Sequence, residues 1–578
     1  MSTQRTLVLA VLLVARAVTA QPQAEFVPVT DRVLQHPDPA DWLMWRRTLD
    51  TWGFSPLTQV NRKNVGSLRM VWTRALGPGL QEGTPLVYRG VMYFPNPSDL
   101  VQAINAASGD LLWEYRRSLP SDLGEYFPVP SINRNIAIFG DSIIDTSSDD
   151  YLYALDARSG ALQWETKLFD YHHGAQQTSG PIIANGKVIS GRGCEPKGSP
   201  AACVILAHDA KTGRELWRRP TIAAAGSADG KSWGDTPDDQ RWHVGAWMVP
   251  SFDPELNLVF IGTSVTSPAP KFAIAGNDKK YLYHNSTLAL NADTGEVVWY
   301  YQHIVDHWDL DHPFERLLVE TVVAPDPKEV AWINPRVRSG ERRKVVTGIP
   351  GKTGVVYTLD RATGEFLWAR PTVDQNVLQK IDTLTGEVTV NPETTFVEMG
   401  QTRLVCPSTT GGKNWPSGTY SPLGNVMFFP LQNTCMMTTA ILGRPSFESL
   451  YGIKNVEQIA PNHTNVGTIY AISVESGKTL WKYEQRAAML SLLSTAGGLI
   501  FGGDANGRFH AFDQQTGKVL WEVNLGSPIS GYPISFAVGN KQYIAVSTGS
   551  SLTAMAENRL TPELHASLGN NLFVFALP

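Results

Sequence analysis

Cysteine, long apolar runs and excess positive charge are all scarce in this sequence. Its 578 residues include four cysteines, none of them in the Cys-x-x-Cys-His motif that attaches a c-type haem. Beyond the N-terminus no segment approaches the roughly 18 apolar residues that a membrane-spanning helix needs. The 49 Lys and Arg against 54 Asp and Glu give a formal net charge of −5, without the basic footprint of a nucleic-acid-binding protein. These absences disfavour a covalently bound haem, a membrane span and a nucleic-acid partner.

The first 20 residues have the pattern of a secretory signal peptide. Arg5 precedes an apolar stretch from Leu7 to Val14, and residues 18–20 read Val-Thr-Ala. A charged start, a short apolar core and small residues before a cleavage point are typical of such leaders. We therefore expect cleavage near Ala20 and a mature chain of residues 21–578, exported to the periplasm. No cysteine lies near the cleavage point, which argues against a lipid anchor.

A short signature recurs along the chain: Ser or Thr, then Gly, then Trp four residues after the glycine. An apolar strand ending in Asp or a similar residue usually precedes it. Asp, Ser and Thr favour turns and glycine adopts positive φ, so each signature predicts a hairpin whose second strand carries a tryptophan. Trp72 marks an eighth unit that lacks the glycine. The complete signatures are Ser108-Gly109 to Trp113, Ser159-Gly160 to Trp164, Thr212-Gly213 to Trp217, Thr294-Gly295 to Trp299, Thr363-Gly364 to Trp368, Ser476-Gly477 to Trp481 and Thr516-Gly517 to Trp521.

This repetition predicts an all-β protein, an eight-bladed β-propeller with tryptophan-docking repeats. Each unit of such a fold buries its faces only against its neighbours, so residues 21–578 are expected to form one domain. The apolar segment 571–575, Asn-Leu-Phe-Val-Phe, is predicted to close the ring by joining the first blade. We interpret the eight tryptophans as packing residues between blades. Long spacings, as between Trp217 and Trp299, predict loops on one rim, where function commonly resides.

The segment His307-Trp308-Asp309-Leu310-Asp311 is the strongest candidate for chemistry. In an extended segment residues i and i+2 point to the same side, so Asp309 and Asp311 can serve one cation and one proton together. The alternative interpretation is a solvated acidic loop, because charged residues are mostly exposed. A zinc site built from His303, His307 and His312 is a second alternative. It would need three ligands converging around an open position, and nothing in the spacing supports that convergence.

Four further motifs accompany the tryptophan signature: 81–85 (Gln-Glu-Gly-Thr-Pro), 251–257 (Ser-Phe-Asp-Pro-Glu-Leu-Asn), 308–311 (Trp-Asp-Leu-Asp) and 411–415 (Gly-Gly-Lys-Asn-Trp). Together with the signature they resemble the pyrroloquinoline quinone (PQQ) dependent alcohol dehydrogenases over nearly the whole mature chain. The resemblance implies PQQ in the central funnel of the propeller, with Ca²⁺ or a lanthanide ion on the quinone. It also implies oxidation of a small-molecule alcohol to an aldehyde or ketone, with electrons passed to a separate soluble acceptor such as a cytochrome c.

The resemblance assigns roles at the metal and the reacting bond. Asp309 falls where the family places a ligand that is also the catalytic base. Asp311 falls where the lanthanide-using members carry an additional carboxylate, and an extra carboxylate favours a cation of higher charge. Glu195 matches the metal-binding glutamate of the family, although an ordinary charged turn residue is its alternative interpretation.

PQQ carries three carboxylates and a planar ring, so it needs cations, hydroxyls and a stacking surface. Arg134 matches a family arginine near the quinone, and Trp247 matches the tryptophan on which PQQ lies. Lys352 matches the cationic residue at the reactive carbonyl, where it would stabilise charge that develops in hydride transfer. The remaining predicted polar contacts are Glu82, Ser147, Thr178, Asn414 and Trp415. Ser147 and Thr178 could equally be plain strand residues, because hydroxyl side chains commonly satisfy nearby backbone groups.

The chain departs from the family at one metal ligand. The family usually has Asn in a Gly-Thr-Gly-Asn stretch, but residues 262–266 read Gly-Thr-Ser-Val-Thr. Val265 stands in the place of the Asn and cannot coordinate a metal. Ser264, Thr266, Asn277 or water could substitute, Asp311 could carry more of the coordination, or this subgroup could bind its ion differently.

Two lids that cover the quinone in many members are also missing. There is no pair of adjacent cysteines, for which the matching region is near 128–130 (Pro-Val-Pro), and the opposite tryptophan is replaced around 489–491 (Met-Leu-Ser). We therefore expect a wider mouth and a bulkier substrate than methanol, such as a secondary or cyclic alcohol.

The four cysteines have a different expected use. Cys194 and Cys203 close a short loop beside Glu195, and Cys406 and Cys435 bracket the Asn414 loop. Disulfides persist in exported proteins, so these two pairs are the preferred connectivity, while the other connectivities stay open.

A second class of function also stays open, namely a non-catalytic exported propeller that binds or assembles other envelope proteins, because fold alone does not decide function.

Overall fold

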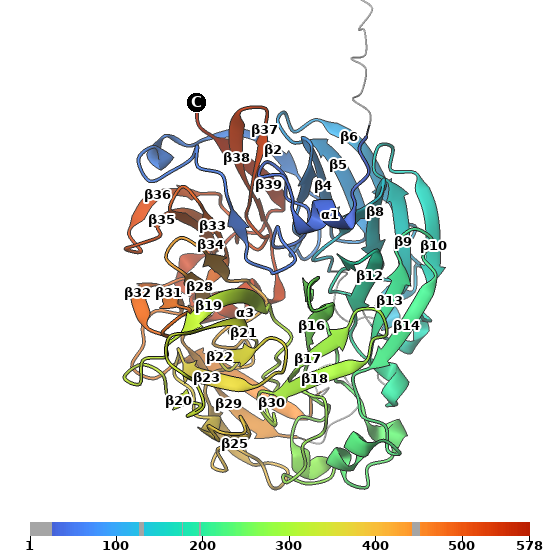
Figure 1. Cartoon of the computed structure of the whole chain (residues 1–578), viewed down its shortest axis with the longest axis vertical. Helices are drawn as coiled ribbons and strands as arrows, with labels where there is room; N and C mark the ends of the chain where they lie inside the picture. The colour runs from blue at the N-terminus through green and yellow to red at the C-terminus, as the bar shows by residue number, and fades with distance from the viewer. Residues whose placement is uncertain (1–25, 127–131, 176, 196–197, 442–450) are drawn as a thin grey trace, which may run out of the picture.

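The computed structural model describes residues 26–126, 132–175, 177–195, 198–441 and 451–578. The expected signal peptide lies outside these residues. The described chain forms a ring of antiparallel sheets around a central axis, with the N-terminal strands in blue beside the C-terminal strands in red (Figure 1).

Within the described residues eight sheets form the blades, each with four main strands, and this confirms the predicted propeller. The strands are given in their order across each sheet. The first blade contains β3 (Leu86–Tyr88), β4 (Val91–Asn96), β5 (Leu100–Asn105) and β6 (Leu111–Arg116), and the second contains β7 (Ala137–Phe139), β8 (Ser142–Thr146), β9 (Tyr151–Asp156) and β10 (Leu162–Lys167). The third contains β11 (Ile182–Ala184), β12 (Lys187–Gly191), β13 (Val204–Asp209) and β14 (Glu215–Pro220), and the fourth contains β15 (Ser251–Asp253), β16 (Leu258–Gly262), β17 (Ser286–Asn291) and β18 (Val297–Gln302).

The other four blades carry two additional short strands. The fifth blade contains β19 (Leu317–Val323), β21 (Glu341–Gly348), β22 (Val355–Asp360) and β23 (Phe366–Pro371), with β20 (Trp332–Ile333) added. The sixth contains β27 (Thr419–Ser421), β28 (Val426–Gln432), β31 (Gly467–Ser473) and β32 (Thr479–Gln485), and the seventh contains β33 (Met489–Thr495), β34 (Leu499–Asp504), β35 (Arg508–Asp513) and β36 (Val519–Asn524), with β1 (Phe54–Ser55) added. The eighth contains β37 (Ile534–Val538), β38 (Lys541–Thr548), β39 (Asn571–Ala576) and β2 (Arg69–Ala75).

The last blade closes the ring with strands from both ends of the chain. β39 pairs antiparallel with β2, from Arg69 opposite Ala576 to Ala75 opposite Asn571. The prediction that segment 571–575 joins the N-terminal unit is therefore confirmed. Trp72 lies on β2, which is the edge strand of this blade, so it occupies the same place as the tryptophans of the complete signatures.

The tryptophans dock onto the glycines of the neighbouring blades. A β-carbon added to Gly160 would lie 2.5 Å from Cε3 of Trp113 in the preceding blade. The indole Nε1 of Trp113 also donates to the carbonyl of Ala157, 3.1 Å away. Glycine is required here twice, because its φ is +72° and because the ring packs directly on its Cα. The same contact joins Trp72 to Gly109, Trp164 to Gly213, Trp217 to Gly295, Trp299 to Gly364, Trp368 to Gly477 and Trp481 to Gly517.

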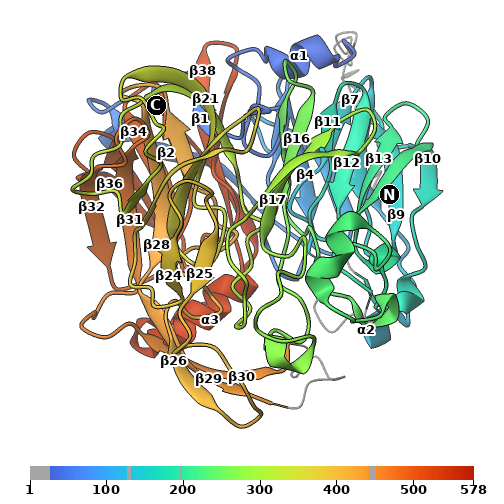
Figure 2. The ribbon, with the colours of Figure 1, turned by 60° about the horizontal axis from the view of Figure 1, so that its bottom comes forward.

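Accessory elements gather on one face of the ring. The three-stranded sheet of β26 (Thr402–Val405), β29 (Thr434–Ala440) and β30 (Ile453–Ile459) projects from this face, with α2 (Leu123–Tyr126) and α3 (Leu552–Leu560) nearby (Figure 2). The remaining elements are α1 (Asp31–Gln35), the hairpin of β24 (Leu378–Ile381) and β25 (Val388–Val390), and 3-10 turns such as Ala228–Trp233. Among the described helices, none has the length and apolar character that crossing a bilayer requires.

The docking contact can be tested with two glycines of similar backbone conformation. Gly140→Ala, at φ +60° with open space around its Cα, should cost about 1–2 kcal/mol of unfolding free energy from left-handed strain alone. Gly160→Ala should cost about 1–3 kcal/mol more, because its methyl group would overlap Trp113. Urea unfolding of both variants measures the difference. Equal losses would show that the ring contact contributes nothing at this position.

Candidate functional site

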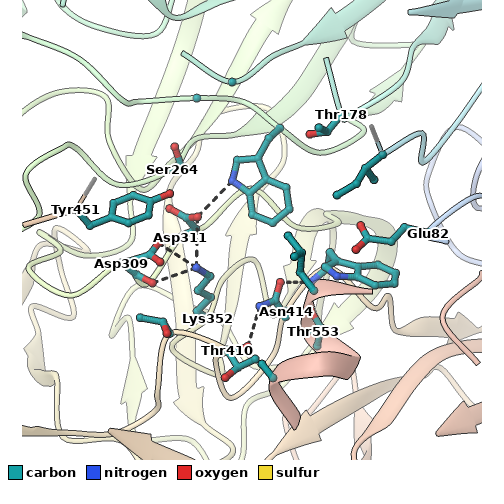
Figure 3. A pocket seen from close by; sticks show the side chains of 18 of the residues that line it. Glu82, Thr178, Ser264, Asp309, Asp311, Lys352, Thr410, Asn414, Tyr451 and Thr553 are labelled. Atoms are coloured by element: carbon teal, nitrogen blue, oxygen red, sulfur yellow. Dashed lines mark hydrogen bonds and ion pairs between the residues drawn. The ribbon is translucent and has the colours of Figure 1, made fainter. Parts of the chain in front are cut away.

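A cavity of about 650 Å³ opens on the face that carries the accessory elements. Its wall is built from loops of several blades, from the projecting sheet and from α3 (Figure 3). Residues far apart in sequence therefore meet at one place. The predicted site residues that line this cavity are Glu82, Arg134, Thr178, Trp247, Asp309, Asp311, Lys352, Asn414 and Trp415.

The ammonium group of Lys352 holds the two aspartates together. Its Nζ lies 3.0 Å from Oδ1 of Asp309 and 3.4 Å from Oδ2 of Asp311 (Figure 3). Asp311 is fixed from two other sides, because Trp247 Nε1 donates to its Oδ2 at 3.3 Å and the backbone N–H of Val265 donates to its Oδ1 at 2.8 Å. The two carboxylates are thus both paired, and the acidic segment is not a solvated loop.

Burial and charge alter the protonation of this cluster. Burial raises the pKa of the Asp309 carboxyl well above its ordinary value, and the negative charge of Asp311 adds to that rise, while Lys352 opposes it. Burial lowers the pKa of Lys352, but Asp309 and Asp311 raise it by more, so the net pKa lies above the ordinary value. A carboxyl group with a raised pKa, such as that of Asp309, is suited to accept a proton. An ammonium group that keeps its charge, such as that of Lys352, is suited to stabilise negative charge that develops nearby.

A second aspartate shapes the loop that carries the first. Asp306, which is fully buried, accepts from the backbone N–H of Trp308 at 2.6 Å and of Leu310 at 2.5 Å. Asn285 Nδ2 donates to the same carboxylate at 3.0 Å and to the carbonyl of Leu310 at 2.9 Å. Between these contacts Asp309 is held at φ +66°, a left-handed conformation that is unfavourable without such support.

Aromatic and cationic groups form the opposite side of the cavity. Arg134 Nη2 lies 2.6 Å from Oε2 of the fully buried Glu82, and its Nη1 donates to the carbonyl of Thr178 at 2.9 Å. Its guanidinium carbon is 5.1 Å from the ring centre of Trp247 and 5.9 Å from that of Trp415. Burial raises the pKa of Glu82, and the charge of Arg134 opposes this rise.

The loop before Trp415 is held by its own polar groups. Asn414 Nδ2 donates to the carbonyl of Thr410 at 2.8 Å, and Asn414 Oδ1 accepts from the backbone N–H of Trp415 at 2.8 Å. Beneath the loop, Lys413 and Glu315 form a completely buried ion pair of 2.7 Å. A pair without solvent contact fixes the loop in one conformation, because breaking it would leave an uncompensated buried charge.

These residues fit a flat anionic quinone. Trp247 and Trp415 offer aromatic rings, Arg134 and Lys352 offer positive charge, and all four side chains line one cavity. Asp309 and Asp311 provide hard oxygen donors of the kind that Ca²⁺ and similar cations take. The arrangement therefore fits PQQ, and the two carboxylates fit a hard cation beside it.

Two predicted residues lie elsewhere. Ser147 does not line the cavity; its hydroxyl bonds to Asp149 and also to the backbone carbonyl of Tyr151 at 3.3 Å. Glu195 Oε1 lies 3.4 Å from Arg192 Nη2 and 3.5 Å from His173 Nδ1. Accordingly, nowhere in the described ranges do three or more His, Cys, Asp or Glu side chains converge as a metal-binding group.

The histidines near Asp309 also do not form a zinc site. His303 bonds through Nε2 to Thr287 Oγ1 at 2.8 Å, and His312 bonds through Nδ1 to the carbonyl of Leu310 at 2.8 Å. His307 lines a separate cavity beside Gln302 and Thr395. The three imidazoles support the surrounding loops instead of sharing a ligand.

The structure adds cavity residues that the sequence did not identify. They come mainly from the insertion between Trp368 and Trp481 and from α3, for which the only signal was unusual spacing without a repeated motif. These segments reach over the cavity, so they determine the shape of its mouth. The added residues are Ile132, Gly193, His243, Gly245, Thr409, Thr410, Tyr451, Asn455, Glu457, Leu552, Thr553, Ala556, Arg559 and Leu560. Ser264, which the sequence offered as one possible replacement for the family Asn, also lines the cavity.

The structure contains both preferred disulfides. The S–S distance is 2.05 Å for Cys194–Cys203 and 2.03 Å for Cys406–Cys435. Cys194 itself lines the cavity, so the first disulfide braces the wall next to Glu195. Of the two expected missing lids, 128–130 lies outside the described residues, while 489–491 belongs to the buried strand β33 and adds no aromatic ring to the cavity.

The PQQ family model described as glucose/ethanol/alcohol dehydrogenase, beta-propeller domain, matches residues 42–391 and 443–544. The chain therefore belongs to the family of PQQ-dependent alcohol dehydrogenases.

Individual relatives agree over most of their length. The quinohemoprotein alcohol dehydrogenase ADH-IIG of Pseudomonas putida is 30% identical over 544 residues, which cover 89% of this chain and 73% of that protein. The quinoprotein alcohol dehydrogenase PedH of P. putida KT2440 is 29% identical, over 86% of this chain and 84% of PedH. The structure of a europium-containing methanol dehydrogenase matches with a TM-score of 0.83 at 25% identity, covering 94% of this chain and 99% of that one.

Replacement of Asp306 by alanine should destabilise the protein strongly. The change would leave the buried N–H groups of Trp308 and Leu310 without an acceptor, at roughly 1–3 kcal/mol each. Asp382→Ala is the control, since Asp382 accepts from two backbone N–H groups in an exposed turn, and it should cost only about 0.5 kcal/mol. Chemical denaturation measures both. Similar losses in the two variants would contradict the role given to Asp306.

Proposed function

We propose that this chain oxidises an alcohol to an aldehyde or ketone with PQQ and a hard metal ion, Ca²⁺ or a lanthanide. The observation that carries the proposal is the group of Asp309, Asp311 and Lys352, which shares one cavity with Trp247 and Arg134. The family membership supports the same chemistry. When bound, PQQ supplies the two-electron acceptor for the hydride that leaves the alcohol carbon.

Asp309 acts as the base that takes the hydroxyl proton. Lys352 occupies its Oδ1, so Oδ2 is the oxygen left to accept a proton from the substrate. The raised pKa that burial gives this carboxyl supports the role, because a general base works best when its pKa approaches the operating pH. Lys352, beside it, stabilises the negative charge that develops in hydride transfer.

The residues that would hold the metal ion are Asp309 and Asp311 together with Glu195. The two aspartates already lie around one ammonium group, whereas Glu195 would have to exchange its contacts with Arg192 and His173 for the metal. The second aspartate favours a trivalent ion, because more negative ligands stabilise more positive charge. One structural relative is a europium-containing methanol dehydrogenase, which is consistent with that choice.

The residues that would hold the cofactor are Trp247, Arg134, Thr178, Asn414, Trp415 and Glu82. The expected loss of both lids supports a secondary or cyclic alcohol as the substrate. Ser147 remains a proposed contact only if PQQ reaches past the cavity wall. The mature chain, residues 21–578, works in the periplasm as one propeller domain. It passes electrons to a separate acceptor such as a cytochrome c, because the sequence has no haem-attachment motif of its own.

Reconstitution tests the proposal as a whole. Purified metal-free and PQQ-free protein is supplied with PQQ and either Ca²⁺ or La³⁺, and dye reduction is followed with primary, secondary and cyclic alcohols. Turnover should require both the quinone and a metal, with La³⁺ and the bulkier alcohols giving the higher rates. Protein that retains no quinone after desalting and turns over no alcohol would support the non-catalytic binding propeller instead.

Asp309→Asn should lower kcat by about 10²–10⁴-fold, the usual contribution of a positioned general base. The amide keeps the size and one oxygen of the side chain, so PQQ should still be retained, which its absorbance measures. Asp278→Asn is the control, because Asp278 is largely exposed and pairs with Lys279 outside the cavity. Wild-type turnover in Asp309→Asn would contradict the assigned base.

A further inference from the structure

Val265 stands where the family has its Asn ligand, and hydrogen bonds to its backbone hold it in place. Val265 is completely buried, and its backbone N–H donates to Asp311 Oδ1 at 2.8 Å. Its carbonyl oxygen contacts His243 Nδ1 at 3.2 Å. Both backbone groups of Val265 are therefore engaged, and its side chain carries no donor. Val265 therefore offers no side-chain oxygen to an ion, and Ser264, Thr266 and Asn277 are the side chains that could replace the Asn.

Two of the nearby candidates are already committed. Thr266 Oγ1 accepts from Lys271 Nζ at 2.8 Å and donates to the carbonyl of Pro268 at 3.1 Å. Asn277 Nδ2 donates to the carbonyl of Phe396 at 2.8 Å, and Asn277 lines the separate cavity of His307. Neither Thr266 nor Asn277 lines the cavity of Asp309.

Ser264 differs from both. Ser264 is completely buried and lines the cavity with Asp309 and Asp311 (Figure 3). Its Oγ makes no hydrogen bond to any of the residues that the structure describes. Two hydrogen bonds hold the backbone of Ser264 in place. Its N–H donates to the carbonyl of Gly245 at 2.8 Å, and its carbonyl accepts from the N–H of Asn285 at 3.1 Å. A buried hydroxyl without a partner costs about 1–3 kcal/mol, so the fold maintains an oxygen here that a ligand can satisfy.

We infer that Ser264 Oγ is a ligand of the metal ion and takes the place of the family Asn beside Asp309 and Asp311. The inference rests on the proposed function, since it concerns the same ion. Ser264 immediately precedes the residue whose N–H binds Asp311, so the hydroxyl and the carboxylate belong to one wall. A neutral, hard oxygen is the donor type that Ca²⁺ and lanthanide ions accept.

The test compares Ser264→Ala with a matched serine. Ser190 is also completely buried with an unpaired Oγ, but it lies on β12 outside the cavity. PQQ-loaded wild type, Ser264→Ala and Ser190→Ala are titrated with Tb³⁺ by equilibrium dialysis. Luminescence lifetimes in H₂O and D₂O then count the water molecules on the bound ion.

Ser264→Ala should bind Tb³⁺ roughly 10- to 100-fold more weakly, the loss typical of removing a residue from a metal environment. It should also carry about one more coordinated water, because water fills the vacated ligand position. Ser190→Ala should match the wild type in both respects. Ser264→Thr, which keeps the oxygen, should restore the affinity and the lower water count.

Unchanged Tb³⁺ affinity and water count in Ser264→Ala would overturn the inference. So would an equal loss in Ser190→Ala, because the effect would then come from deletion of any buried hydroxyl. Failure of the wild type to retain PQQ and Tb³⁺ is a different result, and it would overturn the proposed function itself. Thermal unfolding of each variant verifies that the compared proteins are folded.

Discussion

The contact between the repeated tryptophan of one blade and a glycine of the next blade is the interaction on which the whole molecule depends. A single blade cannot bury both of its faces, so each sheet is stable only when its neighbours are in place. Seven such contacts, from Trp72 on Gly109 to Trp481 on Gly517, set the spacing of the described blades. The pairing of β39 with β2 then closes the ring. Because the ring is rigid, loops from distant parts of the sequence meet in one cavity.

The fold could be predicted because the docking contact leaves a local trace in the sequence. Gly160 must lack a side chain where Trp113 packs, and the seven complete signatures repeat that glycine and tryptophan at the same spacing. Site residues within motifs, such as Asp309 and Trp415, could be predicted because those motifs resemble the family. Tyr451 and the α3 residues could not, because they come from unrepeated insertions whose path no periodicity reports. Ser147 illustrates the opposite difficulty, since a serine on a strand bonds as readily to its own loop as to a ligand.

The site is built against the preferences of its own residues. Asp309 is buried, close to another carboxylate and in a left-handed conformation, and each of these features costs free energy. Asp306 and Asn285 stabilise the strained turn through hydrogen bonds to its backbone, while Lys352 offsets the negative charge. The support lies outside the cavity and the reactive groups lie inside it. This division explains how a stable propeller can hold a buried carboxyl group whose pKa is raised above its ordinary value.

The metal environment follows from the same electrostatic balance. When both carboxyl groups are ionised, Asp309 and Asp311 bring two negative charges and Lys352 brings one positive charge, so the cluster has a net negative charge that a cation can neutralise. Lys352 holds one oxygen of each carboxylate, which limits the oxygens that remain for an ion. A cation of high charge then requires further oxygen ligands. These ligands should add no positive charge, and they should reach the ion without any rearrangement of the loop. Ser264 meets both conditions, because its hydroxyl is neutral, belongs to a residue that lines the cavity and has no hydrogen-bond partner among the described residues.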